Sequence, residues 1–280
     1  MEIAEVLRER WGLTASRVEP LDGGMGSFTW SAVGNGWRVV VKTVDGRDNG
    51  FAPGLELAER LADGGVTTGR PVRSSDGRIA ERVDGRVVGV LEFVDGTPLG
   101  SAEADQRAIG GLLGRVHELS AVEPGDLEAW LGVVTQWDDY LDLEPWIRPA
   151  CESAVSDALA LDDLSWAGLH GDPATDAFLR RPNGDLALID WGAAMYGPIL
   201  YDVASATMYN GRPHVVSSYL DARPDRADEV NLKLDTFLRV RYAVQAAYFA
   251  WRCTEDVRVG IKSPAENQKG LADARRSFGL

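Results

Sequence analysis

Cysteine and histidine are scarce in this sequence of 280 residues, which holds two cysteines and three histidines. Cys151 and Cys253 are too few for a disulfide framework, and they do not have the spacing of a zinc site. The histidines are scattered, so no transition-metal cluster is predicted. The charged first residues contain no apolar stretch typical of a signal peptide, and we therefore expect a reduced, cytoplasmic protein.

Positive charge and long hydrophobic runs are also lacking. Acidic residues number 43 and basic residues 29, which gives a formal net charge of −14. A nucleic-acid partner is not expected, because such surfaces need clustered positive charge. The longest apolar run, around residues 87–94, is too short to cross a bilayer, so no membrane partner is expected either. An acidic balance suits a cationic substrate, but it is also a common means of keeping a protein soluble.

The sequence does contain enough material for a folded core, with 45% hydrophobic and 26% charged residues. This composition excludes disorder, and the length suits one large domain or two lobes. Strand patterns dominate the first third, and helical patterns follow. Strands are predicted at 18–21, 28–33, 37–42, 79–83 and 87–93, and helices at 3–11, 55–62, 104–119, 130–141, 144–161, 201–209, 213–220 and 227–251. We therefore predict an α+β fold with a small β-rich lobe (1–94), a larger helical lobe (95–280) and a hinge near 94–98.

Two strand-like segments each deliver an aspartate, Asp172 and Asp190, beside the turn sequence 182–185. Phosphoryl transfer needs such a pair, because one carboxylate takes the proton of the acceptor hydroxyl and another holds the magnesium that bridges the phosphates. For either residue alone, a turn cap (Asp172) or a strand end (Asp190) is the better explanation. Together with Lys42, which ends a β-branched run, the two aspartates favour phosphoryl transfer.

The order of six motifs resembles the aminoglycoside phosphotransferase and choline kinase family, relatives of the eukaryotic protein kinases. The resemblance covers most of the chain. Its motifs are the glycine-rich loop 23–27, the strand 39–42 that ends in lysine, the hinge 90–99, the helix 112–117, the triplet Asp190-Trp191-Gly192 and the tail 197–202. The resemblance implies a bilobal, protein-kinase-like fold and an ATP- or GTP-dependent kinase that uses Mg²⁺.

The resemblance also implies roles for individual residues. Asp172 would be the catalytic base and Asp190 the principal magnesium ligand. The nucleotide would be bound by Gly24, Gly26, Ser27, Lys42, Glu56, Glu92 and Val94. Within this set, Glu56 is preferred to Glu59 as the partner of Lys42, and the hinge would contact adenine through main-chain groups. The glycine-rich loop could also be a plain hairpin. Of the histidines, His170 is expected to hydrogen-bond the catalytic loop, and His117 to lie in the core.

One position departs from the family pattern. Five residues after the catalytic aspartate, where the family has a metal-binding asparagine, this chain has Ala177. Asp176 could replace the missing ligand, or it could be a solvated loop acid. A weakly active or inactive chain is therefore the alternative to an active enzyme.

The helical lobe carries acidic and aromatic clusters that could bind the acceptor. The weakly indicated substrate residues are Asp138, Asp139, Trp251 and Glu255. The same residues could simply pack the lobe and face water. The predicted function is phosphorylation of a hydroxyl on an aminoglycoside-like antibiotic, an amino sugar or a related metabolite, which could be cationic. The alternative is a nucleotide-binding protein with a degraded metal site. A monomer or a dimer fits the sequence equally well.

Overall fold

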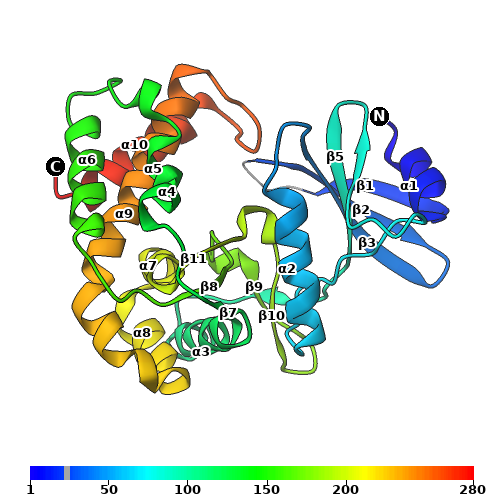
Figure 1. The fold of residues 1–280 in the computed structure, drawn as a ribbon. Helices are drawn as coiled ribbons and strands as arrows, with labels where there is room; N and C mark the ends of the chain where they lie inside the picture. Colours follow the sequence, from blue (N-terminus) through cyan, green and yellow to red (C-terminus); the bar gives the residue numbers. More distant parts are fainter. Residues whose placement is uncertain (22–25) are drawn as a thin grey trace. The chain divides into compact units, whose positions relative to one another are not determined.

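The computed structural model describes residues 1–21 and 26–280, which form two compact units (Figure 1). The N-terminal unit consists of Met1–Leu99 and Thr175–Met195, and the helical unit of Gly100–Ala174 and Tyr196–Leu280. The boundary predicted from the sequence lies after residue 94, with all later residues in the helical lobe. The structure instead packs residues 175–195 with the N-terminal unit.

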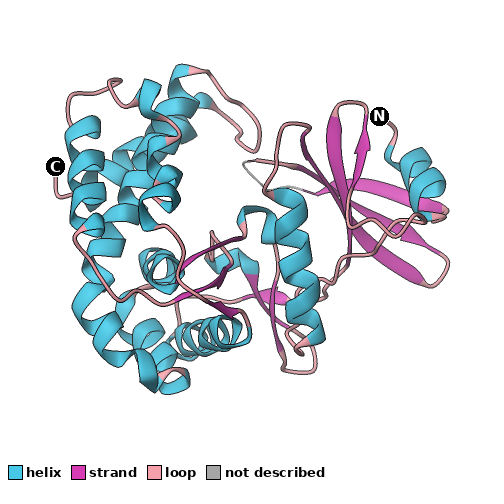
Figure 2. Cartoon of the chain, in the orientation of Figure 1, coloured by secondary structure: helices cyan, strands magenta, loops and turns pink. Residues whose placement is uncertain are grey.

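An antiparallel five-stranded sheet forms the centre of the N-terminal unit (Figure 2). In spatial order its strands are β1 (Ala15–Leu21), β2 (Phe28–Gly34), β3 (Trp37–Asp45), β5 (Arg86–Glu92) and β4 (Glu81–Val83). Side chains alternate between the two faces of a strand. Val39 and Val41 therefore share one face and pack with helix α1 (Ile3–Trp11). Val44 and Val87 belong to the other face, which packs with helix α2 (Phe51–Asp63).

Backbone pairing explains why residues 175–195 belong to the N-terminal unit. Strand β9 (Phe178–Arg180) lies between β10 (Leu186–Leu188) and β6 (Thr97–Pro98) in a second sheet. The 3₁₀ turns η2 (Thr175–Ala177) and η3 (Trp191–Ala193) flank this hairpin. Helix α2 approaches η3 closely at Gly54, where a Cβ atom would lie 2.4 Å from the carbonyl oxygen of Trp191.

One buried carboxylate of the N-terminal unit is fully hydrogen-bonded. Glu81 is 4% exposed and accepts hydrogen bonds from the Ser74 hydroxyl at 2.6 Å and the Arg78 guanidinium at 2.9 Å. Burial raises the pKa of Glu81, but these hydrogen bonds outweigh it and hold the pKa below its ordinary value of 4.5. The folded state therefore favours the ionised carboxylate.

The helical unit is built around α7, which is buried along its length except at Met208 and Tyr209. Helix α9 packs against α6, α7 and α10, and α3 packs against α8. The long helices are α3 (Glu103–Leu119), α6 (Ile147–Leu159), α7 (Ile199–Asn210), α8 (Arg212–Ala222), α9 (Ala227–Thr254) and α10 (Pro264–Ser277). The shorter elements are α4 (Leu127–Trp130), α5 (Gly132–Thr135), η1 (Asp138–Tyr140), η4 (Pro224–Arg226) and the strands β7 (Ala121–Val122), β8 (Trp166–Leu169) and β11 (Met195–Pro198).

The helical unit differs from the prediction in two places. The helix expected over 130–141 is broken into α4, α5 and η1, and the capping aspartate Asp126 begins α4 by accepting from the Ala129 N–H at 3.1 Å. Helix α10 is not among the predicted helices. A capping box between Ser263 and Glu266, with Pro264 in the first turn, is a recognisable start signal for that helix.

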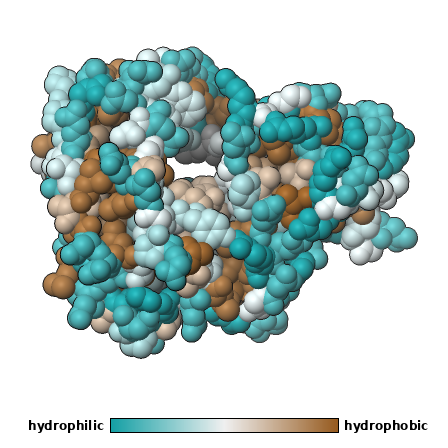
Figure 3. Space-filling view, viewed as in Figure 1, coloured by the Kyte–Doolittle hydropathy of each residue, from teal (hydrophilic) through white to brown (hydrophobic). Residues whose placement is uncertain are grey.

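The face drawn in Figure 3 is mostly hydrophilic, with hydrophobic patches among the polar residues. This agrees with the 26% of charged residues in the sequence. Across the described residues, no helix is both long and apolar enough to cross a membrane.

Candidate active site

Lys42 and Asp190 form an ion pair inside the N-terminal unit. Strand alternation directs Lys42 to the face of the sheet that packs against α2, because it lies two residues from Val44. The Lys42 side chain is only 12% exposed, and a buried ammonium group needs an anionic partner. The carboxylate of Asp190 is that partner.

The structure pairs Lys42 with Asp190 and not with Glu56, so the predicted pairing with Glu56 is wrong. Helix α2 buries Gly54, Leu55 and Ala58, which leaves Glu56 exposed on the opposite side. The alternative residue, Glu59, is also engaged elsewhere, because it accepts from Arg73 at 2.9 Å. Helical spacing placed Glu56 and Glu59 near one face, but it did not show which face the sheet would cover.

Asp190 has a left-handed backbone, with φ 71° and ψ 60°. Aspartate tolerates this conformation better than most residues, and such strain is typical of functional sites. Two contacts hold the segment in place: the Ile189 N–H donates to the Ala177 carbonyl and the Trp191 indole donates to the Leu188 carbonyl, both at 2.9 Å. The turn leaves the Asp190 side chain 48% exposed, so its carboxylate is accessible to a ligand as well as to Lys42.

Ala177 lies next to the segment that carries Asp190, as the hydrogen bond from Ile189 shows. Its methyl group is 5% exposed and offers no metal ligand, whereas Asp176 is exposed to solvent. In the described part of the chain, no group of three or more Asp, Glu, His or Cys side chains could hold a metal by itself. Mg²⁺ in kinases is commonly bound by one or two carboxylates plus phosphate oxygens. The exposed carboxylate of Asp190 fits such a shared site and not a metal cage made by protein alone.

Several predicted nucleotide contacts lie in the hinge and the glycine-rich loop. Gly24 lies outside the described residues, and a Cβ added at Gly26 would meet no atom within 4 Å. The Ser27 hydroxyl lies 3.5 Å from that of Thr29. At the hinge, the Glu92 N–H already donates to the Arg70 carbonyl at 2.9 Å. Among residues 1–21 and 26–280, no hydrogen bond engages the main chain of Val94, which therefore has a donor to offer.

The helical unit holds Asp172 through two residues that the sequence analysis missed. One oxygen of its carboxylate, Oδ1, accepts from Arg241 Nη2 at 2.9 Å and from the Tyr209 hydroxyl at 2.8 Å. The Asp172 side chain is 50% exposed, whereas that of Arg241 is 8% exposed. Tyr209 and Arg241 follow Asp172 by 37 and 69 residues on different helices, and no local motif marks them.

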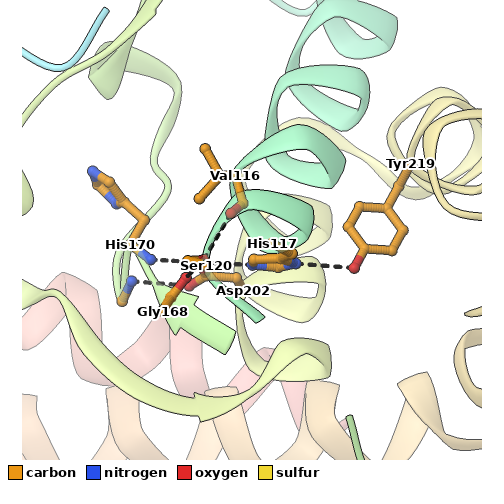
Figure 4. Close-up of polar contacts among 8 residues, drawn as sticks. Val116, His117, Ser120, Gly168, His170, Asp202 and Tyr219 are labelled. Atoms are coloured by element: carbon orange, nitrogen blue, oxygen red, sulfur yellow. Dashed lines mark hydrogen bonds and ion pairs between the residues drawn. The ribbon is translucent and has the colours of Figure 1, made fainter. Parts of the chain in front are cut away.

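A buried network fixes the backbone just before Asp172 (Figure 4). Asp202 on α7 accepts from the backbone N–H groups of His170 at 2.6 Å and Gly171 at 2.9 Å. His117 joins Asp202 at 3.3 Å and the Tyr219 hydroxyl at 2.9 Å. His117 lies in the core, as expected. In Figure 4 the ring of His170 points away from Asp202, and its backbone N–H makes the contact.

An aromatic cluster formed by Trp137, which precedes η1, and by residues of α9 contains one of the predicted substrate residues. Trp251 stacks on Trp137 with ring centroids 6.4 Å apart, and Tyr248 lies 5.7 Å from Trp251. Glu255 lies beside Tyr140: burial raises the pKa of this tyrosine, and the Glu255 carboxylate raises it further.

The two predicted aspartates of η1 differ in their surroundings. Both aspartates are exposed, but Asp138 is paired with Arg148 at 2.8 Å. Arg148 also pairs with Asp142 at 2.7 Å. Asp139 and Glu255 are therefore the better candidates for contact with a cationic acceptor.

Comparison with known proteins identifies the family and the fold. The model of the phosphotransferase enzyme family matches residues 17–233. A homoserine kinase from Beijerinckia indica subsp. indica is 27% identical over 175 residues, which make up 58% of this chain and 53% of that protein. The chain thus aligns with about half of this relative's length.

Two solved structures have the same fold. Spectinomycin phosphotransferase, in complex with ADP and spectinomycin, has a TM-score of 0.71 and 14% identity, with 99% of this chain and 96% of that chain covered. Choline kinase from Streptococcus pneumoniae has a TM-score of 0.71 and 16% identity, with 99% and 97% covered. The predicted α+β, protein-kinase-like fold is confirmed. Because the family model spans well over half of the sequence, the chain belongs to the phosphotransferase enzyme family.

Proposed function

We propose that the protein is an ATP-dependent small-molecule kinase that phosphorylates a hydroxyl group of an amine-bearing acceptor. The observation that supports this best is the Lys42–Asp190 ion pair, in which a nearly buried ammonium and a half-exposed carboxylate lie together. A nucleotide triphosphate with its metal needs both kinds of charge. The ADP bound to spectinomycin phosphotransferase supports an adenine nucleotide, with GTP as the other candidate.

The reaction follows from the chemistry of the three charged groups. Asp172 accepts the proton of the acceptor hydroxyl as that oxygen attacks the terminal phosphorus, and the bond to the leaving ADP breaks. Lys42 neutralises charge on the nucleotide phosphates. Asp190 would bind Mg²⁺, which when present offsets negative charge on the phosphate oxygens. The reaction requires Asp172 and Asp190 to act on the same phosphoryl group.

The charges around the aromatic cluster favour a neutral or cationic acceptor. The nearby arginines already have partners. Arg148 forms ion pairs with two aspartates, and Arg252 donates hydrogen bonds to Asn267 and Tyr248. Exposed carboxylates and aromatic faces remain, and both attract amines. Homoserine, spectinomycin and choline, after which these relatives are named, all carry a hydroxyl group and a nitrogen that is cationic at neutral pH. An aminoglycoside-like antibiotic, an amino sugar and a small amino alcohol are therefore the acceptor classes to test.

Ala177 supports a second candidate function. A chain without the family's asparagine could bind a nucleotide and transfer phosphate weakly or not at all. Asp172, Lys42 and Asp190 are all retained, and this favours the active enzyme. Cytoplasmic location and a monomeric or dimeric state remain predictions.

Transfer of labelled phosphate from ATP tests the proposal. The acceptor panel is homoserine, choline and spectinomycin, each with and without Mg²⁺. We expect Asp172→Asn to lower turnover by more than tenfold, a barrier increase above about 1.4 kcal/mol, with little change in nucleotide affinity. Asp190→Ala should abolish magnesium-dependent nucleotide binding in calorimetry. Asp221→Asn, on the exposed side of α8, is the matched control. Nucleotide binding without transfer to any acceptor would support the second candidate.

A further inference from the structure

The carboxylate of Asp172 is held through one oxygen only. Oδ1 receives hydrogen bonds from both Arg241 and Tyr209, whereas within the described residues no hydrogen bond reaches Oδ2. We infer that Arg241 and Tyr209 are positioning residues, which fix Oδ1 so that Oδ2 faces the acceptor and takes its proton. This inference rests on the proposed kinase function and adds to it a division of roles between the two oxygens.

Arg241 is suited to this role because a second hydrogen bond, to a residue of α7, fixes its guanidinium group. It lies in the middle of α9, and its Nε donates to the hydroxyl of Ser205 on α7 at 2.9 Å. Its Nη2 donates to Asp172 at 2.9 Å and to the Tyr209 oxygen at 2.7 Å. Burial by itself lowers the pKa of Arg241, but the neighbouring tyrosines and Asp172 raise it more, so the group stays charged. A buried cation without its carboxylate would be costly, which ties Asp172 to this place.

Tyr209 completes the arrangement by bridging the ion pair. Tyr209 as a whole is 40% exposed, but its hydroxyl lies between Arg241 and Asp172, accepting from the first and donating to the second. Loss of hydration raises the pKa of Tyr209, and the group therefore remains a protonated donor at neutral pH. With two donors at fixed positions on Oδ1, the plane of the carboxylate is fixed as well.

A fixed plane matters because the terminal torsion of aspartate is otherwise broad. A half-exposed carboxylate on a loop would sample many orientations, and only a few present an oxygen to the acceptor. Holding the group before the substrate arrives lowers the barrier through orientation. The two residues therefore affect the chemical step and leave nucleotide binding, which is assigned to Lys42 and Asp190, unchanged.

Steady-state kinetics of two conservative variants test the inference. Tyr209→Phe removes one donor and keeps the ring, and Arg241→Lys keeps the charge and loses the fork geometry. We expect each to lower kcat by about tenfold or more, equal to about 1.4 kcal/mol or more in barrier, while KM for ATP stays within about twofold. Tyr242→Phe and Arg239→Lys, both on α9 with Arg241, are the matched controls, and they should leave kcat unchanged. A variant of Tyr209 or Arg241 with normal kcat, or with a rise in KM for ATP alone, would overturn the inference.

Thermal unfolding gives a second test that needs no acceptor. Asp172→Asn should lower the melting temperature, because it leaves the Arg241 charge unpaired. In the double variant Asp172→Asn, Arg241→Gln, the loss should be smaller than the sum of the two single losses. Additive losses would show that the pair is not formed and would overturn the inference. If the wild type transfers phosphate to no acceptor, the proposed function fails. The comparison of single and double variants then still shows whether Asp172 and Arg241 form an ion pair.

Discussion

Asp202→Asn would break the network that holds the backbone ahead of Asp172. Asp202 is fully buried and accepts from three groups, the N–H groups of His170 and Gly171 and the ring of His117. Asparagine keeps one acceptor oxygen, but its NH₂ group would face an N–H donor that the second carboxylate oxygen of Asp202 now accepts from. A hydrogen bond to a charged group contributes about 1.5–3 kcal/mol, and breaking a buried charged contact costs about 3–5 kcal/mol. We therefore expect the free energy of unfolding to fall by about 3 kcal/mol.

Calorimetry and kinetics measure the two expected consequences. For a chain of this size, each kcal/mol shifts Tm by about 2–4 °C, so a decrease of about 6–12 °C is expected. Turnover should fall as well, because the backbone of His170 and Gly171 positions Asp172. The control Asp221→Asn, on an exposed face of α8, should change stability by less than about 0.5 kcal/mol. A Tm within 2 °C of the wild type, or full turnover at 25 °C, would refute the reasoning.

Three further predictions concern carboxylates in the N-terminal unit. Glu56→Gln should leave turnover and KM for ATP within about twofold of the wild type, because Lys42 pairs with Asp190 and not with Glu56; a large loss would restore Glu56 as the partner. Asp176→Ala should raise the magnesium concentration needed for half-maximal activity, and Ala177→Asn in that background should recover part of the activity; identical magnesium titrations for the wild type and Asp176→Ala would contradict this. Glu81→Gln should be destabilising above pH 4.5 and progressively less so below it, since the folded pKa of Glu81 is lowered and its contribution is lost as pH falls; urea unfolding across pH 3–7 measures the difference, and a pH-independent one would contradict the assignment.

Local patterns in the sequence were sufficient for most of the fold. The alternation of Val39 and Val41 indicated a strand with one buried face, and the structure extends it to Asp45. The helix expected over 227–251 is α9, three residues longer at its end. Pairing between distant segments was not predictable in this way. Nothing local in Phe178–Arg180 shows that it pairs with Thr97–Pro98 and so joins the N-terminal unit.

The candidate site shows the same division between local and distant information. Asp172, Asp190 and Lys42 could be predicted as site residues because they lie in short motifs whose order resembles that of the family. Arg241 and Tyr209 were missed because long helices bring them to Asp172, and their own sequence surroundings are ordinary helix. The prediction that Glu56 pairs with Lys42 was wrong because the helical periodicity of α2 does not show which of its faces packs against the sheet.

The contacts around Asp172 also determine when, during synthesis of the chain, its loop can reach the final structure. The loop of His170 and Asp172 leaves the ribosome before Asp202, Tyr209 and Arg241, which contact it from further along the chain. Domains tend to fold as units during synthesis, at about 5–20 residues per second. A nascent chain that ends before α9 would carry the proposed base without its cation. We therefore expect the proposed base to reach its final geometry late in synthesis, only after α9 has been made and has packed against α7.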